Sequence, residues 1–71
     1  MNRNFMVKKV GSERSFKRIT KVLFEHRIHY YVEVVDDGKL IKVNVGGTKK
    51  RTTKRFDICN ELGFEEMGPW I

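Results

Sequence analysis

This sequence of 71 residues has a single cysteine and no long apolar run, and each shortage excludes a class of protein. Its single cysteine, Cys59, rules out a disulfide within the chain and a cysteine-based zinc site. A lone thiol suits a reducing compartment, so we expect a cytoplasmic protein. No apolar stretch approaches the roughly 20 residues that a membrane-spanning helix needs, and the first residues lack the apolar core of a signal peptide. We therefore expect no membrane partner.

Positive charge is what the sequence has in excess. Fifteen lysines and arginines stand against nine aspartates and glutamates, which gives a formal net charge of +6. An excess of this size favours an anionic partner, either a nucleic acid or an acidic surface of another protein. The alternative is that the charge serves solubility alone, because small domains often carry a net charge of about 2–8. The length predicts one domain with a small core.

The stretch IHYYVEVVDDGKLIKVNV, residues 28–45, predicts a β-hairpin. Asp37-Gly38 is a strong two-residue turn signal, because a type I′ turn requires positive φ at both central positions. With that turn one face is wholly apolar and aromatic, and on the other face Glu33 lies opposite Lys42 as an oppositely charged pair. The expected pairs on the apolar face are Val34 with Ile41, Val32 with Val43, and Tyr30 with Val45.

Amphipathic helices are predicted on both sides of this hairpin. The first, residues 12–27, has Ser12 as its N-cap. At 100° per residue its apolar stripe consists of Phe16, Ile19, Val22, Leu23 and His26. The second, residues 52–62, is capped by Thr52 or Thr53 and ends at Gly63, although its first turn can begin as early as Thr48. Its apolar face consists of Phe56, Ile58, Cys59 and Leu62.

The two ends of the chain complete the fold. Residues 4–10 predict a strand that Gly11 ends, and residues 64–71 predict a short closing strand or a segment packed over the core. The hairpin needs a cover for its apolar face, and the helices are the available covers. The fold class is therefore α+β in the order β-α-β-β-α(-β): an antiparallel-rich sheet with two helices on one face, ferredoxin-like or like a double-stranded RNA-binding domain. A right-handed crossover is expected to place the first strand parallel beside a hairpin strand.

The segment VGGTKKRTTKRF, residues 45–56, is the main candidate for a binding site. Two glycines that lead into a helix present unpaired backbone N–H groups, and the helix dipole adds positive potential there. Cations surround that point, and a second group lies on the solvent side of the first helix. The alternative is that both groups are solvated faces. The residues predicted to contact phosphates are Lys49, Lys50, Arg51, Lys54, Arg14, Lys17, Arg18 and Lys21.

The stretch VEVVDDGKLIKVNVGGTKKRTTKRFDICNEL resembles the second half of a double-stranded RNA-binding domain, in which a glycine and a Lys-Lys pair precede the last helix. The resemblance implies that Lys49 and Lys50 contact phosphates. It covers under half of the chain, and only two strands separate the helices here instead of three. The layout and the stretch HYYVEV also resemble HicA-type mRNA interferase toxins, but Arg27-Ile28 precede His29 where that family has a Gly-Ser-His pattern.

Catalysis is not predicted, because a catalytic site needs a constellation of groups. His26 and His29 have no evident partners for a metal, and Cys59 falls on an inner helix face. We expect a non-enzymatic protein without cofactors or metals that binds nucleic acid, RNA or DNA, with low sequence specificity. The alternative is an interaction protein, such as a viral or regulatory inhibitor, that docks on an acidic surface. Its candidate anchor is the tail, with Met67, Pro69, Trp70 and Ile71.

Overall fold

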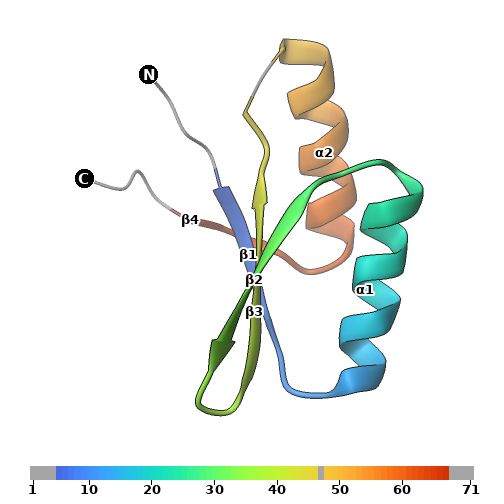
Figure 1. The fold of residues 1–71 in the computed structure, drawn as a ribbon. Helices are drawn as coiled ribbons and strands as arrows, with labels where there is room; N and C mark the ends of the chain where they lie inside the picture. Colours follow the sequence, from blue (N-terminus) through green and yellow to red (C-terminus); the bar gives the residue numbers. More distant parts are fainter. Residues whose placement is uncertain (1–4, 47, 68–71) are drawn as a thin grey trace.

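A computed structural model describes residues 5–46 and 48–67 of the chain (Figure 1). The elements follow one another in the order β-α-β-β-α-β, as predicted. Their bounds are β1 Phe5–Val10, α1 Glu13–Glu25, β2 Tyr30–Val35, β3 Gly38–Asn44, α2 Lys49–Glu61 and β4 Glu65–Met67. Asn4, the first residue of the predicted strand, and residues 68–71 of the predicted tail lie outside the described residues.

The four strands form one antiparallel sheet in the order β2-β3-β1-β4, and both helices cover the same face of it (Figure 1). This is the order of a ferredoxin-like fold, so the α+β prediction is confirmed. The expected neighbour of the first strand is wrong in one respect. β1 pairs antiparallel with β3 instead of lying parallel beside a hairpin strand. The reason is that β3 lies between β1 and β2 in the sheet. The connection through α1 therefore crosses over the position of β3 to reach β2, and β1 and β2 are not neighbours.

Helix α1 begins and ends close to its predicted bounds. Ser12 is the N-cap, and its hydroxyl accepts a hydrogen bond from the amide of Ser15. Ile19 and Leu23 are fully buried, which confirms the centre of the predicted apolar stripe. Phe24 lies off this stripe and is 78% exposed. It therefore covers no part of the core.

Helix α2 begins three residues earlier than its predicted start, at Lys49. Its N-cap is Thr48 instead of Thr52 or Thr53, and the Thr48 hydroxyl accepts from the amide of Arg51. The early start places the basic residues of the segment inside the helix. Gly63 follows the helix with a φ of 90°, the left-handed conformation expected of a residue that ends a helix.

The hairpin forms with its predicted faces but in a register shifted by two residues. Val32 lies opposite Ile41 and Tyr30 opposite Val43, and the turn consists of Asp36 and Asp37. Neither aspartate has a positive φ, so the type I′ turn is not used. A shift of two leaves every side chain on its predicted face, because side chains alternate with a period of two.

Two ion pairs form at the sheet, one between β1 and the β2–β3 turn and one between β2 and β3. Lys9 Nζ lies 2.6 Å from Asp37 Oδ2, and this ammonium group lowers the pKa of Asp37 below its usual value. Lys42 Nζ lies 3.3 Å from Glu33 Oε2. The predicted Glu33–Lys42 pair therefore forms, but between diagonal neighbours, because Leu40 is directly opposite Glu33.

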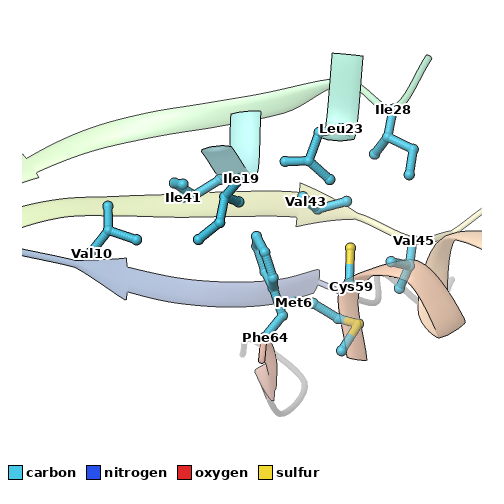
Figure 2. Close-up of a cluster of buried hydrophobic side chains, with 10 residues drawn as sticks. All are labelled: Met6, Val10, Ile19, Leu23, Ile28, Ile41, Val43, Val45, Cys59 and Phe64. Atoms are coloured by element: carbon cyan, nitrogen blue, oxygen red, sulfur yellow. The ribbon is translucent and has the colours of Figure 1, made fainter. Parts of the chain in front are cut away.

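The core lies between the helices and the helix-facing side of β1 and β3 (Figure 2). No polar or charged residue of the described ranges is buried. The stability of the fold therefore depends on apolar burial. Separately, none of the described helices has the length and hydropathy to cross a membrane. The buried residues are Met6, Val10, Ile19, Leu23, Ile28, Ile41, Val43, Val45, Cys59 and Phe64.

Candidate functional site

The turn that joins α1 to β2 has an unusual backbone. The amide of Arg27 donates to the carbonyl of Phe24, and the amide of Ile28 donates to the carbonyl of Leu23. This pair of hydrogen bonds is the Schellman motif that ends many helices. The residue at its centre, Arg27, has a φ of 57°, and it is the only residue other than glycine with a positive φ in the described part of the chain.

Helix α2 ends in the same motif, with glycine in the equivalent place. There the amide of Gly63 donates to Asn60 and the amide of Phe64 to Cys59. Glycine adopts the left-handed conformation without steric cost, whereas other residues lose roughly 1–2 kcal/mol. An arginine in such a position costs stability, and strained residues of this kind concentrate at functional sites.

A surface hollow of about 470 Å³ opens beside this turn. It lies between the C-terminal end of α1 and the N-terminal half of α2, which the antiparallel course of the helices brings together (Figure 1). Six of its lining side chains carry nitrogen and none carries a carboxylate. We call it the basic hollow; it is lined by His26, Arg27, Ile28, His29, Arg51, Lys54, Arg55 and Ile58.

A smaller hollow of about 230 Å³ continues from the basic hollow around the end of the sheet. The two share His29 and Arg55. The Nη1 of Arg55 donates to the carbonyl of Gly46 at 3.1 Å, which holds the guanidinium group between them. The smaller hollow also includes Asn44 and Tyr31, and Tyr31 is 63% exposed. Cationic side chains and an exposed aromatic ring therefore form one continuous surface.

The glycine-to-helix junction differs from the predicted anion site. The amide of Gly46 donates to Asn44 Oδ1 at 2.9 Å, and the amide of Arg51 donates to the cap hydroxyl of Thr48. These two backbone donors are therefore not available to a phosphate. Gly47 lies outside the described residues. The side chains of the segment, more than its amides, carry the potential for anion binding.

The structure divides the eight predicted phosphate-binding residues into three groups. Arg51 and Lys54 line the basic hollow. Lys49 and Lys50 are exposed in the first turn of α2. The four cations of α1 are exposed along that helix, and none of them lines the basic hollow: Arg14, Lys17, Arg18 and Lys21.

Arg27, His26 and His29 are not among the residues predicted to contact phosphates, yet they form one wall of the basic hollow. One signal for them is present in the sequence. The stretch FEHRIHY passes from helix to strand without a glycine, so a left-handed residue that ends this helix has to carry a side chain. Pro69, Trp70 and Ile71, proposed above as an anchor for a protein partner, lie outside the described residues.

Cys59 is fully buried, and burial raises the pKa of its thiol from 9.0 to about 11. The thiol is therefore protonated at neutral pH and is a poor nucleophile. Within residues 5–46 and 48–67 there is no group of three histidine, cysteine, aspartate or glutamate side chains close enough together to hold a metal ion.

The buried thiol predicts a fall in stability at alkaline pH. The unfolded thiol loses its proton near pH 9.0 and the folded thiol only near pH 11, so the stabilisation is complete below pH 9 and is lost as the pH rises to 11. Denaturant titrations should show the free energy of unfolding falling by up to about 3 kcal/mol more for wild type than for Cys59→Ala. The variant controls for every other ionisable group, because the two proteins share all of them. Parallel curves for the two proteins would contradict the burial of the thiol.

Comparisons of the chain with protein-family models, with curated proteins and with solved structures find no match.

Proposed function

We propose that this protein binds single-stranded nucleic acid through the basic hollow, with low sequence specificity. The observation that supports the proposal is the lining of that hollow. It contains three arginines, one lysine and two histidines, and no carboxylate. A concave surface of one charge sign concentrates the field and attracts a polyanion. The net charge of +6 adds a long-range attraction of the same sign.

The geometry of the cations suits a phosphate backbone. Arg51 and Lys54 are three residues apart in α2 and therefore lie on one side of the helix. Arg27 faces them from the α1–β2 turn. Arginine presents a planar fork of donors that binds phosphate oxygens in pairs. The hydrogen bond to Gly46 holds the Arg55 guanidinium group in place. Contacts of this kind position a strand without reading its sequence.

Tyr31 is the feature that favours unpaired strands over a duplex. Its exposed ring lies past His29 and Arg55 along the same surface. A strand whose phosphates occupy the basic hollow can bring a base to this ring, and stacking of a base on an aromatic side chain contributes about 1–3 kcal/mol. A duplex keeps its bases stacked internally and gains nothing from such a ring.

Fluorescence anisotropy with labelled 12-nucleotide DNA and RNA strands of mixed sequence tests the proposal. We expect Arg51→Ala/Lys54→Ala to weaken binding at low salt by about tenfold or more, because two charge-assisted contacts are lost. The slope of log K against log salt should become shallower by about 1.4, since each phosphate contact on a single strand contributes about 0.7.

The matched control is Lys17→Ala/Lys21→Ala, which removes the same charge from the exposed face of α1. It should weaken binding less than twofold. Equal losses for the two double variants would show that binding follows net charge and that the basic hollow is not the site. Polyglutamate that competes as well as the oligonucleotides would favour an acidic protein surface as the ligand.

A further inference from the structure

In the described part of the chain, most of the exposed large apolar side chains lie on the edge strand β2. Among the described residues, four large apolar or aromatic side chains are exposed: Phe24 at 78%, Tyr31 at 63%, Val32 at 42% and Val34 at 79%. Three of them belong to β2. The fourth, Phe24, lies in α1 and lines a hollow of about 720 Å³ together with Tyr30, the first residue of β2. An apolar patch concentrated at one edge marks an interaction surface.

The two edges of the sheet differ in how they are protected against strand pairing. β4, at the opposite edge, is three residues long, and two of them are glutamates. Short, charged edge strands resist pairing with another chain. β2 has six residues, Tyr30–Val35, with a single charge at Glu33 and neither proline nor lysine. Apart from Glu33, it therefore lacks the features that block edge pairing.

The hairpin determines which backbone groups of β2 point away from the sheet. Val35 and Gly38 flank the two-residue turn and form a pair, so they exchange both of their hydrogen bonds. The backbone groups of Glu33 and Tyr31 point to β3 for the same reason. Those of Tyr30, Val32 and Val34 point outward. The side chains of these three residues share the helix-covered face, because Val32 lies opposite the buried Ile41.

We propose that β2 pairs with β2 of a second copy of this chain, antiparallel about a two-fold axis that passes through Val32. The sheet then continues across both copies with eight strands. In this register the outward-pointing groups of Val32 meet those of its own counterpart, and Tyr30 pairs with Val34 of the second copy. Glu33 lies opposite Tyr31 of the second copy. Two neighbouring registers also join outward-pointing groups. One places Glu33 opposite itself, and like charges directly opposite destabilise a sheet. The other places Tyr31 opposite itself and pairs only residues 30–32 of β2, because Val34 then lies opposite Ile28, outside the strand.

The side chains at this edge complement one another under the same symmetry. Val34 protrudes with 79% of its surface exposed, and Phe24 borders the hollow beside Tyr30. Pairing of Tyr30 with Val34 of the second copy brings that valine to the hollow and against Phe24. The two-fold axis repeats the contact on the other side. The two most exposed apolar side chains of the described chain therefore cover each other twice.

Cysteine cross-linking and sedimentation equilibrium, both without nucleic acid, test this pairing. Val32→Cys should form a disulfide-linked dimer under mild oxidation, because a residue opposite its own counterpart in a sheet lies within disulfide distance. Glu33→Cys should not. The native Cys59 does not compete because it is buried. The mass of the wild type should rise toward that of a dimer with concentration, and Val34→Lys should raise the dissociation constant about tenfold or more, since the added charge enters the interface twice.

Asn60→Lys is the matched control, because it adds the same charge at an exposed position of α2 and should leave the dissociation constant unchanged. A wild type that stays monomeric at millimolar concentration overturns the proposal and leaves the edge for a strand of another protein. Faster cross-linking of Glu33→Cys than of Val32→Cys overturns the proposed register. Neither outcome bears on the basic hollow, because no residue that lines it belongs to β2, and its binding is assayed separately.

Discussion

Gly38→Ala is expected to destabilise the protein by about 3 kcal/mol or more. A Cβ atom at this position would lie 2.3 Å from the backbone carbonyl oxygen of Val10, a distance that real Cβ atoms do not reach. The φ of Gly38 is 154°, a conformation that residues with a side chain rarely adopt. Overpacking costs about 1–3 kcal/mol and an unfavourable backbone conformation about as much. The sum is comparable to the whole stability of a domain of this size.

Urea denaturation followed by circular dichroism measures this effect, and Gly11→Ala is its control. Gly11 lies one residue after Val10, and a Cβ atom there would meet only the carbonyl oxygen of Asp37 at 3.8 Å, an ordinary contact. Gly11→Ala should therefore unfold within about 1 kcal/mol of wild type. If the two alanine variants unfold at the same urea concentration, the close approach of β1 to β3 at Gly38 is absent in solution.

The same close approach explains why the hairpin turn was not predictable from its own residues. Asp37-Gly38 is the better local turn signal, but Gly38 is required inside β3, where β1 passes against it. The turn therefore moves to Asp36 and Asp37. This requirement comes from a strand distant in the sequence, so no local pattern contains it. The faces were predictable because the alternation of apolar and polar residues survives a shift of two.

The burial of the hairpin was only partly predictable for a related reason. Alternation places Val32, Val34 and Ile41 on one face, and the structure confirms that face. Ile41 is fully buried because β3 lies inside the sheet, whereas Val34 is largely exposed because β2 lies at an edge. The sequence periodicity of an edge strand does not differ from that of an inner strand. Strand order depends on the crossover through α1, which local patterns do not specify.

The candidate site was also only partly predictable, because some of its residues are close together in the sequence and the others are brought to them only by the fold. The cations of α2 were recognisable from the run of lysines and arginines, and two of them, Arg51 and Lys54, line the basic hollow. Their neighbours across the hollow come from the α1–β2 turn because the two helices run in opposite directions (Figure 1). Spacing along the chain does not reveal which end of α1 meets the start of α2. Arg14 and Lys17, which are also predicted to contact phosphates, lie toward the other end of α1.

Arg27→Gly is expected to make the protein more stable and a weaker binder at the same time. Glycine adopts the φ of 57° at this position without strain. The gain should be about 1 kcal/mol, because the relief of roughly 1–2 kcal/mol is partly offset by the greater freedom of glycine in the unfolded chain. Loss of the guanidinium group from the basic hollow should weaken the binding of single-stranded nucleic acid by about tenfold at low salt. A residue kept only for the fold would not show these opposite signs.

Two further variants separate the backbone from the charge in this prediction. Arg27→Ala removes the charge but keeps a Cβ atom in the left-handed conformation, so binding should weaken as in Arg27→Gly without any gain in stability. Arg27→Lys keeps the charge and should retain most of the affinity. Thermal and urea denaturation give the stabilities, and anisotropy titrations give the affinities. If Arg27→Gly binds as tightly as wild type, the strained arginine has no part in binding. Arg27, which faces Arg51 and Lys54 across the basic hollow, is then excluded from the proposed binding site.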